Sequence, residues 1–272
     1  MQAASRESLA AAADRLDQVV AGADADALRV LGDELFAVLD VLVNERVLRR
    51  HLTDPGNPAE ARARLARGLF DGKVSEQAAV TVAELARSRW SSSVDLLEAV
   101  ETLARRVVLV LAERDGVLEE VEDELFRFGR ILDGQPRLRE LLADETTPAD
   151  GRTALLDGLV ADKVAPATRQ LLDQTVRVPR GRSLEFVVGQ LAELAAAMRS
   201  RSVARVTAAA PLSDEQERRL AQTLSTIFGR SVSVQVELDP DLLGGLVIRV
   251  GDEVIDGSVV ARLAKARQQL PS

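Results

Sequence analysis

The side chains that most often perform chemistry are scarce in this sequence. It contains one histidine, His51, and no cysteine, so neither a thiolate site nor the usual zinc constellation can form. A lone imidazole has no partner for conventional acid–base or nucleophilic catalysis, and no serine lies in a Gly-x-Ser-x-Gly elbow. An internal copy of the chain has Leu141 in place of His51, which favours a surface or structural histidine. We therefore expect no catalytic residue, cofactor or metal site.

Two other stretches have compositions that could bind a ligand. Gly244-Gly245 lacks the context of a phosphate loop, because neither GxxxxGK[ST] nor GxGxxG is present. A glycine pair at a strand start more often provides positive φ or a close backbone approach. The acidic run over 119–124 falls where a helix should begin, where negative charge opposes the positive end of the helix dipole. We interpret this run as a solvated helix start rather than a metal site.

Composition limits the partners that the chain can have. Of its 272 residues, 43 are acidic and 35 basic, which gives a net charge of −8. An acidic balance argues against nucleic acid, whose binding normally needs a basic surface. The longest apolar run, 107–112, is far below the roughly 20 residues of a membrane-spanning helix, and the N-terminus has no signal-peptide pattern. We expect a cytoplasmic protein that reaches a membrane only through a partner.

Up to about residue 201 the sequence pattern predicts helices throughout. This part of the sequence also contains an internal repeat. At an offset of 90 residues, no gap is needed between Asp33 and Arg87, and about a third of the positions are identical. Two unrelated helical segments would share apolar residues at similar positions by chance. They would not also share a proline, a glycine and a lysine at the same 90-residue offset. We interpret the repeat as a duplication. The matches include Asp33-Glu34-Leu35-Phe36 with Asp123-Glu124-Leu125-Phe126, and Pro58, Gly68 and Lys73 with Pro148, Gly158 and Lys163.

The repeat predicts two helical bundles, over 1–91 and 115–201, joined by a long helix over 92–114 that both share. Within each bundle, Asn57 and Thr147 are candidate N-caps ahead of a proline, and leucines form a stripe on the helix that follows. Arginine-rich turns at 87–89 and 177–182 end the next helices. We interpret these turns as solvated loops, with partner contacts as the alternative; Trp90, the only tryptophan, should pack beneath the first.

Residues 202–272 have the pattern of a small α+β domain. A strand over 203–208 precedes a helix that begins at a capping box, Ser213 and Gln216, and should bury its leucines together with Ile227 and Phe228. Alternating residues then predict strands over 232–238 and 246–250, followed by Val254-Ile255 across a tight turn. Ser258 is the candidate N-cap of a last helix that reaches Leu270. The fold class is therefore mainly α, with tandem N-terminal helical bundles followed by a small α+β C-terminal domain.

The C-terminal string carries a family resemblance. From Leu238 to Arg262 it combines a strand, a double glycine, a hairpin and a capped helix in one order, and it resembles the C-terminal signature of the delta subunit of bacterial F-type ATP synthase. The mitochondrial counterpart in that family is the oligomycin-sensitivity-conferring protein. The positions that carry the resemblance are structural rather than catalytic: Asp239, Pro240, Gly244, Gly245, Gly251, Asp256, Gly257 and Ser258.

The resemblance implies a non-catalytic stator subunit of the peripheral stalk of a proton-translocating ATP synthase. Its partners would be the N-terminal segments of the alpha subunits, with beta a further candidate, and the b-type stalk, bound by residues 203–270. It would bind no nucleic acid, would not insert into the membrane, and would lie peripherally at the cytoplasmic face of the bacterial cell membrane. The family has a single six-helix bundle, so the duplication leaves open which copy contacts the head.

Two other interpretations use the same residues. One is an unrelated helical adaptor. The other is a small RNA-binding module, because the order strand, helix, strand, hairpin, helix also occurs in such domains. Against it, Phe228 is the only aromatic residue between 203 and 272, so a stacking platform for bases is missing.

Overall fold

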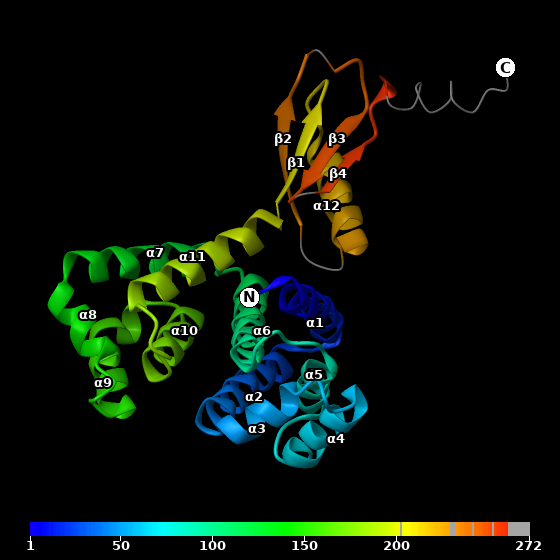
Figure 1. The fold of residues 1–272 in the computed structure, drawn as a ribbon. Coiled ribbons are helices and arrows are strands. Elements are labelled where there is room, and N and C mark those ends of the chain that lie inside the picture. Colours follow the sequence, from blue (N-terminus) through cyan, green and yellow to red (C-terminus); the bar gives the residue numbers. More distant parts are fainter. Residues whose placement is uncertain (202, 229–231, 241, 252, 261–272) are drawn as a thin grey trace. The chain divides into compact units, whose positions relative to one another are not determined.

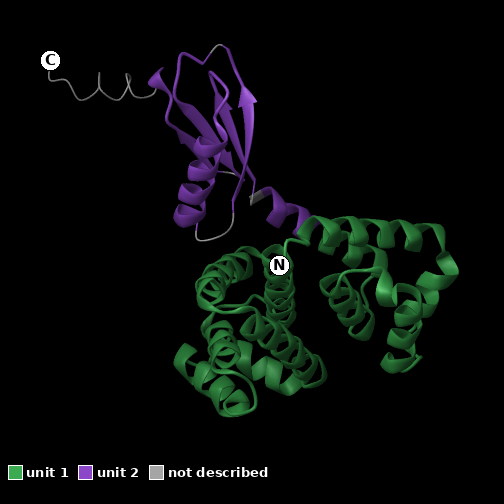
Figure 2. Ribbon diagram, turned by 180° about the vertical axis from the view of Figure 1, so that it is seen from behind, with its two compact units in different colours: residues 1–192 green, residues 193–272 purple. Residues whose placement is uncertain are grey.

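The computed structural model describes residues 1–260 except 202, 229–231, 241 and 252. The chain divides into two compact units, Met1–Ala192 and Glu193–Ser272 (Figure 2). The first unit is helical and the second contains the sheet, so the predicted fold class, mainly α with a small α+β region at the C-terminus, is confirmed.

The helices repeat as the sequence does. The bounds of α3, α4 and α5 recur in α8, α9 and α10 with both ends shifted by 90 residues (Figure 1). The helical elements are α1 (Ala3–Gly22), α2 (Ala25–Asn44), α3 (Arg46–Thr53), α4 (Ala59–Phe70), α5 (Glu76–Arg87), α6 (Ser93–Arg114), α7 (Leu118–Gly134), α8 (Pro136–Ala143), α9 (Ala149–Val160), a short 3-10 turn (Ala161–Lys163), α10 (Pro166–Arg177) and α11 (Leu184–Arg201).

The repeated Asp-Glu-Leu-Phe string supplies the same structural device in both copies. The carboxylate of Glu34 on α2 accepts hydrogen bonds from the backbone N–H and the hydroxyl of Ser75, at the start of α5. Glu124 on α7 accepts equivalent bonds from the backbone of Ala165 and the hydroxyl of Thr168, at the start of α10. Each glutamate thus satisfies an N–H that the helix itself leaves free and places its negative charge at the positive end of the dipole.

This device corrects part of the interpretation of the acidic run. Glu119 and Glu120 are exposed in the first turn of α7, as a solvated helix start requires. Glu124 is only 9% exposed, because it points into the bundle to cap α10 rather than into solvent. The sequence pattern placed Glu124 in the same solvated run as Glu119 and Glu120. Glu124 lies about one helical turn further along α7, where the side chain faces the bundle rather than solvent.

The long helix α6 lies at the centre of the first unit. It runs from Ser93 to Arg114 and contacts α1, α2, α3 and α5 as well as α7 and α10. More than half of its 22 residues are buried, a distribution that fits a helix with neighbours on several sides rather than one apolar stripe. We propose on this basis that α6 closes the first helical module, α1–α6, and opens the second, α6–α11.

Two details of the repeated helices differ from the predictions. Asn57 and Thr147 do not cap α4 and α9 with their side chains; they donate instead to the carboxylates of Asp54 and Asp144, which organise the preceding turns. The leucines of these helices are also partly exposed, at 39% for Leu65 and 37% and 38% for Leu155 and Leu159. The residues buried on these helices are instead Arg62, Ala63, Ala66 and Phe70 on α4, and Arg152, Thr153, Leu156 and Val160 on α9.

The second unit contains a four-stranded sheet with the order β2-β1-β3-β4. β1 pairs in parallel with β2 and antiparallel with β3, which pairs antiparallel with β4. Helix α12 lies along one face of the sheet (Figure 1). The apolar residues of that face pack against its Leu220, Leu224 and Phe228. The elements are β1 (Val203–Ala208), α12 (Asp214–Phe228), β2 (Ser233–Leu238), β3 (Leu246–Val250) and β4 (Glu253–Asp256).

Most of the local predictions for this unit hold. Ser213 and Gln216 form a reciprocal capping box at the start of α12. Ile227 was expected inside but is 62% exposed, because α12 contacts the sheet through a narrow stripe spaced four residues apart and Ile227 lies on its flank. The predicted last helix falls largely in 261–272, outside the described residues.

Candidate functional site

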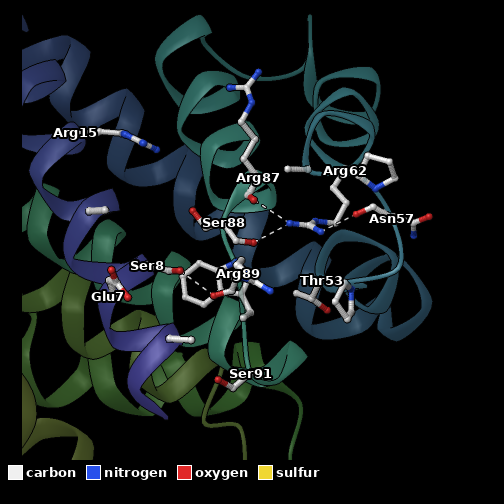
Figure 3. A pocket seen from close by; sticks show the side chains of 16 residues that line it. Glu7, Ser8, Arg15, Thr53, Asn57, Arg62, Arg87, Ser88, Arg89 and Ser91 are labelled. Carbon is white, nitrogen blue, oxygen red and sulfur yellow. Dashed lines mark hydrogen bonds between the residues drawn. The ribbon is translucent and has the colours of Figure 1, made fainter.

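The main candidate site is a groove in the first helical module. It has a volume of about 980 Å³ and lies between α1 and the segment that joins α3 to α4. Ser8 and Arg15 come from α1, whereas Asn57 and Arg62 come from the other side (Figure 3). The α5–α6 turn, residues 87–91, completes the lining, so three segments distant in sequence meet here.

Arg62 fixes the position of that turn. Its side chain is 6% exposed, and its guanidinium donates five hydrogen bonds to backbone carbonyls. Figure 3 draws the bonds to residues that line the groove. Three accepting carbonyls, those of Ala86, Arg87 and Ser88, lie at 2.8–3.0 Å; these are carbonyl groups that the end of α5 leaves without an intrahelical partner. The other two belong to Asp54 and Asn57. Arg62 therefore holds two sides of the groove together.

Replacing Arg62 by methionine is expected to lower the free energy of unfolding by about 2–4 kcal/mol, because several partly buried carbonyls lose a charged donor. The matched variant is Arg152→Met in the second module. Arg152 is also buried, but it makes one long bond, 3.5 Å to the Arg177 carbonyl, and its Nε and Nη1 find no partner among the described residues. Its replacement should cost about 1 kcal/mol or less. Urea unfolding followed by Trp90 fluorescence measures both changes, and equal losses would contradict this assignment.

The charges around the groove are unevenly satisfied. Arg15 forms an ion pair with Glu84 at 2.6 Å, and Arg87 pairs with Glu84 and with Glu60, whose pKa lies below its ordinary value because of the Arg87 hydrogen bond. Arg89 is exposed, and none of the described residues forms an ion pair with it. These ion pairs neutralise Arg15 and Arg87, so Arg89 is the exposed arginine of the lining whose charge stays open to the groove.

Trp90 lies beneath this lining, as predicted. It is 8% exposed, and its indole N–H donates to the carbonyl of Leu85 at 2.7 Å. The hydroxyl of Ser8 donates to the Arg89 carbonyl at 2.8 Å, which fixes the turn against α1. His51, in contrast, is an exposed residue of α3.

A buried ionic cluster occupies a different part of the first unit. Glu101 on α6 is 3% exposed and binds three arginines at 2.6 Å each: Arg105 one turn further along α6, and Arg180 and Arg182 from the turn between α10 and α11. Arg180 has φ of 56°, which makes it the one positive-φ non-glycine residue of the described chain. This conformation aims both arginines of the turn at one carboxylate.

The cluster changes the electrostatics of its members. Burial alone would raise the pKa of Glu101, but the charges of Arg105, Arg182 and Arg180 outweigh it and hold this pKa below its ordinary value. Burial lowers the pKa of Arg105 to about 10, against the attraction of Glu101. The prediction that the turn at 177–182 is a solvated loop is therefore wrong for Arg180 and Arg182, because α6 supplies a buried counter-charge that the local sequence does not reveal.

The signature residues of the second unit meet around the start of β3. Gly244 and Gly245 have φ of 136° and 83°, and a Cβ on Gly245 would lie 2.4 Å from the Gly257 carbonyl oxygen and 2.8 Å from the Ser258 Cα. Val259 N–H donates to the Gly244 carbonyl at 3.0 Å. The double glycine thus permits a close approach between two backbone segments, in a conformation that other residues rarely adopt.

The remaining signature positions lie at turns. Asp239 comes directly after β2, with its N–H donating to the Ala208 carbonyl, and exposed Pro240 follows. Gly251, with φ of 58°, lies at the turn between β3 and β4. Asp256 accepts a bond from the Ser258 N–H at 2.9 Å, which lowers the Asp256 pKa. The structure brings 244, 245 and 256–258 together and leaves 239, 240 and 251 apart.

The groove and the ionic cluster are the features that sequence reasoning missed. The sequence showed that both turns are rich in arginine. It did not show what these turns contact, because the contacting residues lie on α1 and α6, far away in the sequence. In the described part of the chain, no helix has the length and apolar character needed to cross a membrane.

Repeated helices followed by a small α+β unit define the class of this protein as mainly helical, with a mixed sheet in its second unit. A model of the family "ATP synthase delta (OSCP) subunit" matches residues 104–270. Similar curated proteins include "ATP synthase subunit delta" of Streptomyces avermitilis, 46% identical over 99% of this chain and 98% of the relative, and that of Acidothermus cellulolyticus, 43% identical over the full length of both. The chain belongs to the ATP synthase delta (OSCP) family, whose subunit is structural rather than catalytic.

A second kind of relative is longer. "ATP synthase subunit b-delta" of Mycobacterium sp. (strain KMS) is 51% identical over the whole chain, and the chain spans 61% of its length. The family model begins within α6, at residue 104. It therefore covers the second module and the α+β unit, whereas the groove lies in the part of the chain that precedes the match.

Proposed function

We propose that this chain is the non-catalytic stator subunit that links the catalytic head of an F-type ATP synthase to its b-type peripheral stalk. The head contacts are the N-terminal segments of alpha subunits, with beta subunits as a further candidate. The chain holds the head still while the rotor turns. The observation that carries this proposal is that relatives with the name ATP synthase subunit delta match the chain along nearly its whole length.

In this proposal the helical modules bind the catalytic head. A helix laid in a groove between other helices buries an apolar face and leaves a polar rim, and the groove of the first module has the apolar alanines and prolines and the charged rim that this requires. The bonds of Arg62 hold its lining in one arrangement, so a partner would not have to order it.

The α+β unit supplies the contact with the stalk. Its edge strands, β2 and β4, expose apolar side chains, with Leu238 and Val254 each 57% exposed, and nearby Leu243 is 80% exposed. Exposed apolar residues at a sheet edge are typical of interaction surfaces. The name b-delta of the mycobacterial relative joins the two subunits that this proposal places in contact.

The signature residues serve this contact indirectly. Gly244, Gly245 and Gly257 allow two segments to pack, and Asp256 and Ser258 fix the turn that follows β4. We assign them a structural role in shaping the stalk-binding unit. The chain would work at the cytoplasmic face of the bacterial cell membrane, bound peripherally through its partners and without contact with nucleic acid.

The test is co-purification of the full chain with tagged alpha and b subunits of the same ATP synthase, repeated after deletion of residues 203–272. Loss of b together with retention of alpha supports the proposed division of labour. Retention of b after the deletion, or failure of the full chain to capture either subunit, contradicts it.

A further inference from the structure

The duplication allows the two modules to be compared at one place, the turn that follows the fifth helix of each. In the first module this turn is tied to the α3–α4 segment, because buried Arg62 on α4 donates to carbonyls on both sides. The counterpart of Arg62 at the 90-residue offset is Arg152 on α9. Arg152 is just as buried, at 5% exposed against 6%, so both guanidinium groups need acceptors from the protein.

Arg152 does not reproduce the contacts of Arg62. Within the described chain its one hydrogen bond runs to the carbonyl of Arg177 at 3.5 Å, and its Nε and Nη1 meet no acceptor there. Arg62 also binds the turn before its own helix, whereas in the described chain Arg152 makes no hydrogen bond to the matching turn at 144–147. A buried guanidinium that lacks acceptors is destabilising, and it regains water when the helix that carries it moves away.

The turn of the second module is held from another side. Arg180 and Arg182 bind the Glu101 carboxylate on α6, the first helix of that module, at 2.6 Å each. The counterpart of Glu101 in the first module is Ala11, which can form no such ion pair. The turn has therefore changed partners between the copies: α4 holds it in the first module, and α6 rather than α9 holds it in the second.

The polar contacts that still tie α8 and α9 to the later helices lie near the surface. The Glu145 carboxylate accepts a bond from the exposed Gly181 N–H at 3.1 Å, and three ion pairs have both side chains about a third exposed or more. These pairs are Arg177 with Asp150, Arg169 with Asp157, and Arg139 with Glu185. Exposed pairs contribute little to stability, because water screens them. The buried attachment of α8 and α9 is therefore mainly apolar.

The end of α9 also lacks a device that closes α4. Gly72, two residues after α4, has φ of 75°, and the N–H groups of the next two residues donate to the Phe70 carbonyl. In the second copy Asp162 stands at the place of Gly72, and the chain forms the short 3-10 turn Ala161–Lys163, in which Asp162 is not helical. Because residues other than glycine rarely adopt positive φ after a helix, α9 does not end in the same way.

We propose that α8 and α9 (136–160) form a hairpin that opens as a unit while the rest of the helical unit stays folded, whereas α3 and α4 (46–70) stay closed. The opening breaks the exposed pairs and lets water reach Arg152. It leaves the Glu101 cluster intact, because that cluster joins α6 to the α10–α11 turn without α8 or α9. In the proposed stator function, on which this last step rests, the α8–α9 hairpin is where the joint between head and stalk yields under load.

Native-state hydrogen exchange of the full chain, resolved to peptide fragments by mass spectrometry, tests the proposal directly. The amides of 136–160 are expected to show protection at least about thirtyfold lower than those of their counterparts, 46–70. Their exchange should depend only weakly on low urea concentrations, because a local opening exposes little surface. Equal protection of the two hairpins, or a urea dependence of 136–160 as steep as that of the whole unit, would overturn the proposal.

Thiol labelling gives an independent readout, since the chain contains no cysteine. Thr153→Cys on α9 and Ala63→Cys on α4 introduce a small thiol at matched positions, where the natural residues are 6% and 2% exposed. An excess of a thiol reagent should modify the Thr153→Cys chain at least about tenfold faster than the Ala63→Cys chain. Equal rates, or a faster reaction of the Ala63→Cys chain, would contradict the opening of α8 and α9.

The role of the two arginines is tested by removing each in turn. Arg62→Met should lower the protection of 46–70 at least about tenfold and leave that of 136–160 within about twofold. Arg152→Met should change the protection of 136–160 by less than about fivefold, because little bonding is removed. If Arg62→Met loosens both hairpins alike, the modules do not open independently and the proposal is wrong. Wild-type exchange and thiol labelling decide the proposal even if Arg62→Met does not fold.

The results separate this inference from the stator function. If the two hairpins exchange equally while the chain still captures alpha and b subunits, the hairpin proposal is wrong and the function stands. If capture fails while exchange differs as expected, the opening of α8 and α9 stands as a property of the chain, and the step that places it under load is wrong.

Discussion

Replacing Glu101 by glutamine is expected to lower the free energy of unfolding of the helical unit by about 3–5 kcal/mol at pH 7. The change removes the one carboxylate that three arginines bind and leaves their charges buried without compensation. Two of these arginines come from the turn after α10, so α10 and α11 should lose protection from hydrogen exchange first. Urea unfolding monitored by Trp90 fluorescence gives the overall loss.

The pH dependence provides a second readout of the same variant. The pKa of Glu101 is lower in the folded chain than its ordinary value of 4.5, so the folded state binds its proton less readily than the unfolded state does. The carboxylate therefore contributes its full stabilisation above about pH 4.5, and this contribution is lost as the pH falls through the folded-state pKa. The difference between wild type and Glu101→Gln should narrow below pH 4.5.

A surface pair serves as the control for this prediction. Asp123→Asn also converts an acid to its amide, but its ion pair with Arg127 is exposed, with side chains 64% and 71% accessible. Exposed pairs of this kind contribute about 0.5 kcal/mol or less. If the two variants lose similar stability, the Glu101 cluster is not the joint between α6 and the α10–α11 turn.

The second large effect is expected at Gly245. Alanine there would place its Cβ 2.4 Å from the Gly257 carbonyl oxygen, and φ is 83°. Backbone atoms cannot move aside cheaply, so we expect a loss of about 3 kcal/mol from overlap and conformational strain together. A unit whose core contains few residues has little stability to spare. Exchange of the backbone amides of β1 and β3 should become fast.

Gly72→Ala isolates the conformational part of this effect. Gly72 has a similar φ of 75°, but a Cβ there meets nothing within 4 Å. The expected loss is about 1 kcal/mol. If Gly245→Ala costs no more than Gly72→Ala, the contact between the two signature segments does not stabilise the unit as described.

The sequence predicted those parts of the fold that depend on residues within one helix or strand, or on a repeated pattern. The capping box at Ser213, the strand over 203–208 and the 90-residue repeat all depend on residues close together or on a copied pattern. The predictions were wrong where a distant partner decides the outcome. Glu124 was grouped with a solvated run although α10 recruits it, and Arg180 was assigned to a loop although α6 supplies its counter-charge.

The candidate site could not be predicted for a related reason. Its lining comes from α1, from the segment that joins α3 to α4 and from the α5–α6 turn, and no local sequence pattern links these segments. Only the packing of α1 against the α5–α6 turn shows that they form a groove. The exposure of Leu65 and Leu155 could not be predicted for the same reason. Which side of each helix is buried depends on the neighbouring helices that pack against it.

The most direct measurement of the central proposal is the fate of the catalytic head in cells that lack this chain. We predict that the ATPase activity then leaves the membrane fraction and that ATP-driven proton pumping by membrane vesicles is lost, with restoration by the full chain but not by a chain without residues 203–272. Membranes that keep a fully coupled ATP synthase without this polypeptide would contradict the account.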